Sequence, residues 1–182
     1  QFMSSVAHFY DINGTANLVL GENNNLKLMG YASNDAFNLN SNSLYTYGNI
    51  TGSANWKVNF TKKLISNLNL SYSKYKYELE QRDASVPEDD YRLLTGLQYG
   101  SMKYILSWLP NDKHRVNGGF QTIGYKIEPG EIKPAGNPTN VISEKVANEQ
   151  SIELGAFIDD DIDLSQSVAL NVGLRYARFM SM

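Results

Sequence analysis

Few residues in the chain have the type and spacing that catalysis requires. Its histidines, His8 and His114, lie far apart, and the second falls in a polar turn where a solvated side chain is expected. Ser73 and Lys76 have the spacing of a Ser-x-x-Lys catalytic pair, but the residues around them alternate as in a β-strand. In a strand, side chains three residues apart point to opposite faces, so the hydroxyl of Ser73 cannot contact the amine of Lys76. We therefore predict no catalytic residue and no enzymatic activity.

Two acidic clusters carry the oxygen ligands that hard cations prefer. The first runs from Asp159 to Asp163 and lacks the glycine and the distal glutamate of a calcium-binding EF-hand loop. We predict that it is a polar collar beside a turn, with Asp159 and Asp161 on one face. For the second cluster a solvated loop is the main expectation and cation binding the alternative. Its members are Glu78, Glu80, Asp83, Glu88, Asp89 and Asp90. No metal or cofactor is predicted.

The elements that position these residues are predicted to be β-strands. Between Val168 and Ala177, apolar residues alternate one by one with polar or small residues. Residues 151–159 alternate in the same way, and the polar segment 163–166 lies between the two runs. A period of two over two neighbouring runs predicts an antiparallel hairpin.

The same alternation predicts about eight strands in an up-and-down meander. The earlier ones are expected at residues 8–20, 26–33, 44–60, 67–80, 91–109 and 115–127. Connections near residues 22, 63, 111 and 165 are short, whereas the polar segments 34–43, 81–90 and 128–148 are long. Short turns at one end and long loops at the other are typical of outer-membrane β-barrels.

The fifth predicted strand is longer than a membrane crossing requires, which is about 9–11 residues. Its apolar positions are even from Met102 to Trp108 and odd from Tyr91 to Tyr99, and Gly100 lies between as an expected bulge. We infer that the halves beside the short turns face lipid and that the far halves project above the membrane. Trp56, Phe60 and Trp108 are then expected in an interfacial aromatic girdle.

The composition excludes several classes of protein. With 182 residues the chain is long enough for one domain, and its net charge of −3 gives no general attraction to nucleic acid. Cysteine is absent, which excludes disulfides and thiolate-bound metals. No run approaches the roughly 18 apolar residues of a transmembrane helix. The chain begins at Gln1, and we interpret it as a segment of a larger protein.

The last hairpin resembles a stretch found in the barrels of TonB-dependent outer-membrane receptors. The matching residues are Phe157 to Ile162, with three consecutive aspartates in place of the usual single acid, and Leu170 to Tyr176. This resemblance implies that residues 1–182 form antiparallel transmembrane strands of a larger barrel of about 22 strands. The plug domain and the TonB box of such receptors are not present in this sequence.

The resemblance also implies a function, a location and partners. We expect a receptor in the cell outer membrane of a Gram-negative bacterium that takes up an iron chelate, cobalamin or a glycan. Its partners would be outer-membrane lipid, the ligand, and the TonB system through parts outside this chain. Arg175 is expected to face the lumen and to pair with an acid such as Glu153 or Asp159.

Two alternatives remain at this point. One is a complete, closed barrel of eight strands with a structural or adhesive role. The other is a soluble binding module with a β-sandwich fold, whose strands alternate in the same way. Pairing between the first and last strands would indicate closure, two stacked sheets would indicate a sandwich, and a single open curved sheet would indicate a segment of a larger barrel.

Overall fold

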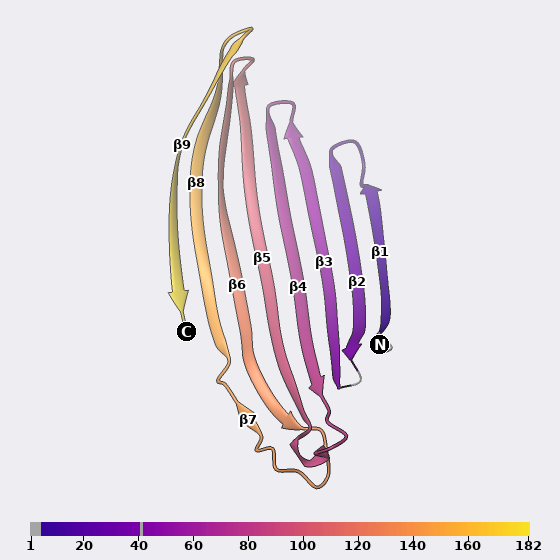
Figure 1. Ribbon diagram of the computed structural model, residues 1–182. Helices are drawn as coiled ribbons and strands as arrows, with labels where there is room; N and C mark the ends of the chain where they lie inside the picture. The colour runs from indigo at the N-terminus through magenta and orange to yellow at the C-terminus, as the bar shows by residue number, and fades with distance from the viewer. Residues whose placement is uncertain (1–4, 41) are drawn as a thin grey trace.

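The computed structural model describes residues 5–40 and 42–182, and nearly all of them belong to one antiparallel β-sheet (Figure 1). The described strands follow one another in the order β1-β2-β3-β4-β5-β6-β8-β9, and the short β7 pairs with β6. Their bounds are β1 Val6–Val19, β2 Asn24–Asn40, β3 Ser43–Thr61, β4 Leu64–Gln81, β5 Tyr91–Asn111, β6 His114–Pro134, β7 Glu144–Lys145, β8 Glu149–Ser165 and β9 Val168–Ser181. The all-β, up-and-down prediction is therefore confirmed.

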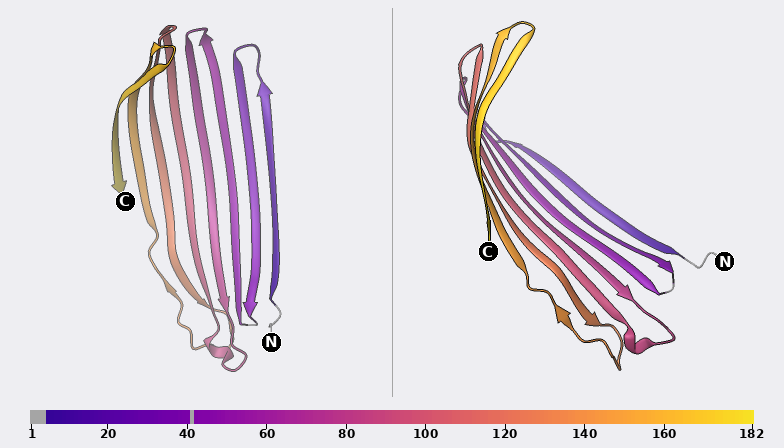
Figure 2. Two further views of the ribbon diagram at one scale, coloured as in Figure 1. Left: turned by 45° about the horizontal axis from the view of Figure 1, so that its top comes forward. Right: turned by 60° about the vertical axis from the view of Figure 1, so that its left-hand side comes forward.

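The sheet is open, twisted and curled (Figure 2). Each long strand pairs with its neighbours in sequence, and within the described residues β1 does not pair with β9. The described residues form a single sheet, with no second sheet packed against it. The β-sandwich and the closed eight-strand barrel are thus both wrong, and the architecture is that of a segment of barrel wall. No helix among the described residues is long and apolar enough to cross a membrane.

The two ends of the sheet differ in their connections. At the hairpin end, the strands are joined by residues 20–23, 62–63, 112–113 and 166–167. Gly21 in the first of these turns has a φ of 87°, a left-handed conformation that favours glycine. At the loop end lie the segments 82–90, which includes a short 3-10 turn at Pro87–Asp89, and 135–148. β1 starts toward the loop end, where Val6 pairs with Asn38, whereas β9 ends partway along the sheet, where Ser181 pairs with Ser151 (Figure 1).

Two of the predicted long connections are shorter than expected. The segment 34–43 is not a loop, because β2 continues to Asn40 and β3 starts at Ser43. Its polar residues occupy ordinary ladder positions, as in the pairing of Asp35 with Tyr47. The segment 128–148 is shortened because β6 runs on to Pro134 and pairs with β7. The prediction of these two loops was wrong because polar residues can also form strands when neighbouring strands pair with their backbone N–H and C=O groups.

Each strand has two faces, which we name after neighbouring residues in β4. Asn69 pairs with Asn55 and Lys103, and these side chains share the Asn69 face. Leu70 pairs with Ala54 and Met102, which share the Leu70 face. The ladders continue in register from strand to strand except at a few shifts, such as the one between Leu94 and Gly96. The described residues of the long strands outside these shifts can therefore be assigned to one face.

A row of glycines crosses the Leu70 face near the middle of the sheet. Successive ladder pairs join Gly14 to Gly30, Gly30 to Gly52, and Gly100 to Gly124. Tyr72 of β4 stands in the same row and pairs with Gly52 on one side and Gly100 on the other. We call these five glycines the glycine row, and we use it to divide each strand into a hairpin half and a loop half. Gly100 pairs in register on both sides, so the predicted bulge there is wrong. The nearby shift in register lies instead between Leu94 and Gly96.

The described part of the chain has no buried hydrophobic side chain. Leu170, Val172 and Leu174 of β9 are 46%, 54% and 79% exposed, so they do not point into a dry protein interior. A sheet of this size without a core leaves its apolar area to be covered by something outside the chain. Its amino-acid pattern must therefore be read face by face.

The register between β4 and β5 can be tested with a cysteine pair. Ser71 and Ser101 are ladder partners whose Oγ atoms are 2.7 Å apart, and the chain has no cysteine of its own. We expect the double variant Ser71→Cys with Ser101→Cys to form a disulfide on mild oxidation, measured by counting thiols with a maleimide. The control Ser73→Cys with Ser101→Cys places the thiols on diagonal neighbours about 7–8 Å apart. Equal oxidation of both pairs would contradict this register.

Candidate functional site

The hairpin half of the Leu70 face is apolar across all the long strands. Trp108, for example, is 52% exposed although its backbone pairs with Leu64 of β4 and Val116 of β6. We call this surface the apolar belt, and its more exposed large members are Leu18, Leu28, Trp56, Leu70, Leu106, Trp108, Phe120, Leu154, Ile158, Val168, Leu170, Val172, Leu174 and Tyr176. Trp56, Phe60 and Trp108 lie near the short turns, where the sequence predicted aromatic residues.

The hairpin half of the Asn69 face is polar and internally hydrogen-bonded. The amide of Asn55 donates to the side-chain oxygens of Asn67, at 2.8 Å, and of Asn69. Farther along the sheet Asn117 accepts from Ser107 at 2.7 Å and donates to Asp159 at 2.7 Å. These contacts follow the ladder rows, since each partner stands on an adjacent strand of the same face.

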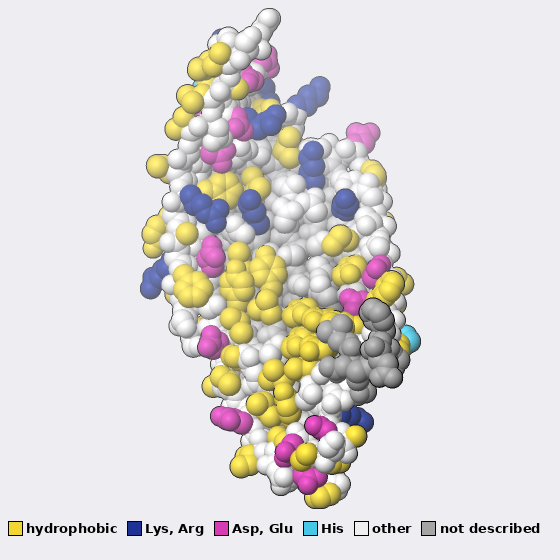
Figure 3. Space-filling view, in the orientation of Figure 1, with side chains coloured by type: hydrophobic (Ala, Val, Ile, Leu, Met, Phe, Trp, Pro, Cys, Tyr) yellow, Lys and Arg dark blue, Asp and Glu magenta, His cyan; other side chains and the backbone are white. Residues whose placement is uncertain are grey.

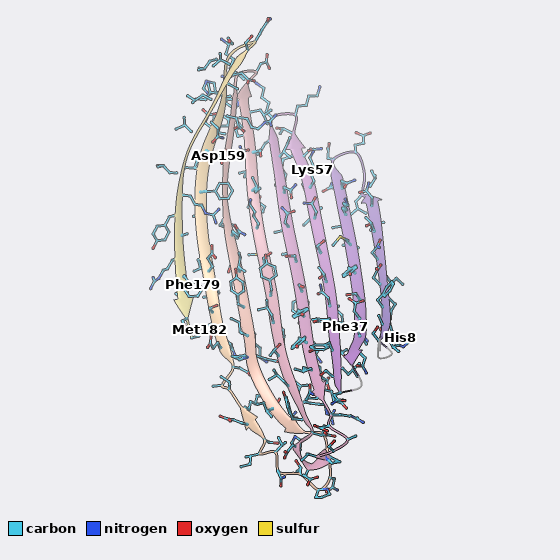
Figure 4. All side chains as sticks on the ribbon, in the orientation of Figure 1. His8, Phe37, Lys57, Asp159, Phe179 and Met182 are labelled. Atoms are coloured by element: carbon cyan, nitrogen blue, oxygen red, sulfur yellow. The ribbon has the colours of Figure 1, made fainter. Side chains whose placement is uncertain are left out.

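Asp159 and Asp161 share the Asn69 face, as the alternation predicted. Asp161 accepts a 2.6 Å hydrogen bond from the amide of Asn171 and pairs in the ladder with Arg115. A hollow of about 590 Å³ opens beside them, lined on its other sides by basic residues that include Lys57 and Lys103. Figure 4 shows Lys57 and Asp159 in the hairpin half of the sheet. This hollow thus combines both signs of charge.

Arg175 lies on the predicted face but does not form the predicted ion pair. Within the described residues its guanidinium donates to Oε1 of Gln121 at 3.3 Å, and no ion pair with Glu153 or Asp159 is formed. The side chain reaches β6 because it crosses Gly155 of β8, where a Cβ atom would lie 3.2 Å from the guanidinium. Glycine at 155 therefore redirects the arginine away from the acids.

Phe157 crosses a neighbouring strand in a similar manner. Its ring covers Gly119 of β6, where a Cβ atom would lie 2.9 Å from a ring carbon and would also collide with the carbonyl oxygen of Tyr104. The ammonium of Lys103 lies 5.5 Å from the centre of the same ring, within the range of a cation–π interaction. The glycine thus makes room for an aromatic side chain inside the polar hollow.

His114 is not a solvated turn residue. It begins β6 on the Leu70 face, and its Nδ1 lies 2.7 Å from Oδ2 of Asp160 in β8. Its side chain is 38% exposed and that of Asp160 28%. This polar pair stands at the hairpin edge of the apolar belt, where Ile162 and Leu170 continue the same ladder row.

The loop half of the Asn69 face is aromatic. Phe37 of β2 stacks on Tyr45 and Tyr47 of β3, with ring centroids 4.9 Å and 5.8 Å apart. Tyr47 meets Tyr77 of β4 at 5.2 Å. The rings of Tyr99 and Tyr125, in β5 and β6, are 5.6 Å apart. We call these residues, together with Phe9, Tyr31, Tyr75 and Tyr91 on the same face, the aromatic band.

A hollow of about 460 Å³ lies at one end of the aromatic band. Phe9, Phe37 and Tyr47 line it together with Asp35, and Phe9 is 79% exposed. Nearer the middle of the band, burial, and then the neighbouring Tyr47, raise the pKa of the Tyr77 phenol above its ordinary value. Because this phenol lies beyond the apolar belt and stays protonated, it remains a hydrogen-bond donor at physiological pH.

Figure 3 shows the contrast between the two halves of the Asn69 face. Basic side chains are visible toward the hairpin end, whereas hydrophobic side chains gather toward the loop end. The Leu70 face has the reverse order, because Lys74, Lys76 and Lys126 follow the apolar belt in its loop half. Both faces therefore change character at the same level of the sheet.

The remaining sequence candidates are not brought together. Ser73 lies on the Asn69 face, with its Oγ 3.1 Å from that of Thr51, whereas Lys76 lies on the Leu70 face. In the second acidic cluster, Glu80 contacts Arg82, Asp90 accepts from the backbone of Asp83 at 2.7 Å, and Asp89 accepts from Asn140. No group of acidic or histidine side chains in the described residues could hold a metal ion.

The clustering of side chains in the aromatic band was not predicted from the sequence. Its tyrosines are visible there, and those at 45 and 47 or 75 and 77 even alternate as face partners. Their convergence depends on the ladder register between strands that are far apart in the chain, such as β2 with β3 and β5 with β6. A full assignment of register would have been the signal.

Comparisons with known proteins support the fold. No protein-family model and no curated protein sequence matches the chain. Among solved structures, the chain is similar to the crystal structure of BauA, the ferric preacinetobactin receptor from Acinetobacter baumannii, with a TM-score of 0.73 and 11% sequence identity. The similarity covers 98% of this chain and 34% of BauA. At that identity it shows a shared fold, and this chain spans about a third of the length of the receptor.

The tight packing of Tyr104 and Phe157 around Gly119 predicts that adding one methyl group there lowers the stability of the protein. Gly119→Ala should lower the free energy of unfolding by about 1–3 kcal/mol, because the added carbon collides with backbone and with Phe157. Gly100→Ala is the matched control, since a Cβ atom there meets nothing within 4 Å. It should be neutral or slightly stabilising. Urea unfolding of the full-length protein in detergent measures both, and equal losses would refute the packing described.

Proposed function

We propose that this chain is part of the barrel wall of a receptor in the outer membrane of a Gram-negative bacterium. The receptor would take up a small nutrient, namely an iron chelate, cobalamin or a glycan, with energy delivered through TonB. Lipid covers the apolar belt in this proposal, and the Asn69 face lines the lumen. The TonB box, the plug and the remaining wall would belong to parts of the protein outside this chain.

The observation that carries the proposal is the concentration of exposed apolar side chains on the Leu70 face in its hairpin half. On β1 and β3 some continue into the loop half, namely Val6, Tyr10, Ile12, Leu44 and Ile50. On β9 the apolar belt extends from Val168 to Tyr176, which agrees with the roughly 9–11 residues that cross a bilayer. On the opposite face at the same level stand Lys27, Lys57 and Asn69. Lipid on one side and an aqueous or protein-filled lumen on the other require this distribution.

The loop halves supply a second argument. At about 3.3 Å per residue, the 21 residues of β5 extend for roughly 70 Å. A lipid-facing band is about 25 Å tall. A large part of each strand therefore projects beyond the bilayer, and Lys74, Lys76 and Lys126 on the Leu70 face suit that aqueous environment. The aromatic band would then line the outer mouth of the lumen.

The similarity to BauA supports the same architecture. BauA is a ferric preacinetobactin receptor, and this chain matches about a third of it with a TM-score of 0.73. The unpaired edges at β1 and β9 are where further wall would join. Uptake is inferred from the architecture, because a large barrel with a lined lumen is the wall that such receptors use.

The membrane contact can be tested by placing a charge on either face of β4. Leu70→Arg should destabilise the full-length protein in lipid vesicles by about 2–4 kcal/mol, because an arginine in the middle of the lipid face is costly. Asn69→Arg, the adjacent residue on the other face, is the control and should cost much less. Unfolding in urea from vesicles is the measurement. A larger loss for Asn69→Arg would reverse the assignment of the two faces.

Transport can be tested in the host cell. The full-length protein should fractionate with the outer membrane, and cells that lack it should lose uptake of one nutrient from a panel of iron chelates, cobalamin and oligosaccharides. The same loss is expected when TonB is deleted, because the energy would come from that partner. Recovery of the protein in the periplasmic fraction, or uptake that persists without TonB, would argue against the proposal.

A further inference from the structure

The charges of the loop half are sorted between the two faces. Every described lysine and arginine in the loop halves of the strands lies on the Leu70 face. They are Lys74, Lys76, Arg92, Lys126, Lys133 and Lys145. Arg82, in the segment after β4, contacts Glu80 of the same face. The Asn69 face carries only carboxylates at this level among its described charged strand residues, for example Asp11, Asp35 and Glu149.

This sorting disfavours an anionic ligand against the aromatic band. A negative group placed there would meet carboxylates and find no basic partner on this stretch of wall, and like charges brought together cost binding energy. Such a wall discriminates through repulsion as well as attraction. Anionic iron chelates and acidic glycans are therefore poor candidates for contact with the aromatic band, whereas the basic residues of the Asn69 face, such as Lys57 and Lys103, stand in its hairpin half.

The remaining side chains of the band match the chemistry of sugars. Aromatic rings offer apolar surface to the C–H groups of a pyranose, and carboxylates or amides accept hydrogen bonds from its hydroxyls. The hollow at β1 to β3 combines the rings of Phe9, Phe37 and Tyr47 with the carboxylate of Asp35, and His8 also lines it. Within the ladder rows of Tyr31, Tyr75 and Tyr99, the side chains of Asn49, Thr51 and Ser73 form a hydrogen-bonded polar cluster on the same face.

The band is also extended rather than compact. It begins at Phe9 in β1 and reaches Tyr125 in β6. Neighbouring strands are about 4.8 Å apart, so five spacings amount to roughly 24 Å. Aromatic contacts spread over that length suit a chain of several rings.

We propose that the aromatic band is a contact surface for a neutral oligosaccharide. This inference rests on the proposed uptake function and narrows its substrate class to uncharged glycans. The sugar rings pack against the tyrosines and phenylalanines of β1 to β6, and their hydroxyls donate to Asp35 and to neighbouring acceptors. The acidic residues exclude negatively charged competitors from the same wall.

The test uses the full-length protein in detergent and isothermal titration calorimetry. The neutral probes are maltohexaose, cellohexaose, xylohexaose and laminarihexaose, and the anionic probes are hexagalacturonic acid and ferric tris(2,3-dihydroxybenzoate). We expect at least one neutral hexasaccharide to bind and neither anionic probe to do so. Tyr77→Ala should weaken the neutral ligand about tenfold or more, because it removes a central ring of the band.

Two variants separate stacking from general damage. Tyr77→Phe keeps the ring and should retain binding within about threefold, on the aromatic-contact argument. Tyr72→Ala removes a tyrosine from the other face of the same strand and should leave binding unchanged. The proposal is overturned if no neutral probe binds, if an anionic probe binds and is weakened by Tyr77→Ala, or if Tyr77→Ala and Tyr72→Ala have equal effects. The uptake function would survive each of these results, since fractionation and TonB dependence test it separately.

Discussion

The backbone hydrogen-bond ladder is the interaction on which the rest of this structure depends. No hydrophobic side chain in the described residues is buried, so the strands are not held together by a core of their own. Each long strand instead satisfies its N–H and C=O groups through its neighbours, and the ladder fixes which side chains share a row. That register gathers tyrosines from separate strands into one band and aligns glycines from separate strands in one row. The neighbours of each side chain are therefore set by its strand, face and ladder row, and not by how deeply it is buried.

A ladder of this kind leaves both faces free to adapt to different environments. In the hairpin half, the Leu70 face is apolar and the Asn69 face polar. In the loop half the Asn69 face is aromatic, and the Leu70 face of β4 to β6 carries lysines such as Lys74, Lys76 and Lys126. A soluble sheet packed on one core would keep its apolar side on the same face along the whole strand. The exchange at the glycine row is therefore the feature that separates this sheet from a half-buried one, and it agrees with a wall that leaves a bilayer partway along its strands.

Much of the fold follows from alternation in the sequence, but its outer half does not. The hairpin at β8 and β9 is evident because Val168 to Tyr176 alternate apolar and polar residues strictly. The segment 34–43 contains few apolar residues, and nothing local reveals that its partner strand would order it. A strand made of Asn, Asp and Ser is specified by the neighbour with which it pairs, which a single sequence does not display.

For the residues of the candidate site, the sequence predicted the face of the sheet but not the contact partner on the neighbouring strand. Alternation correctly placed Arg175, Asp159 and Asp161 on one face of the sheet. It could not give the partner of Arg175, because that depends on the missing side chain at Gly155 in the intervening strand. His114 was misassigned for a related reason, since Asp160 lies 46 residues away in sequence. Periodicity therefore predicts the side of the sheet, and contacts across strands require the register.

The glycine row has a mechanical consequence. Along this line Gly14, Gly30, Gly100 and Gly124 have open space where a Cβ atom would stand, so on these strands no side chain resists bending, and Tyr72 of β4 interrupts the row. Glycines inside strands are points at which sheets curve sharply. The row therefore lies along a line where the sheet can bend, between the apolar belt and the aromatic band. Bending along this line would change the angle between the aromatic band and the apolar belt while the backbone ladder on either side stays paired, and in a closed barrel that angle would set the width of the mouth.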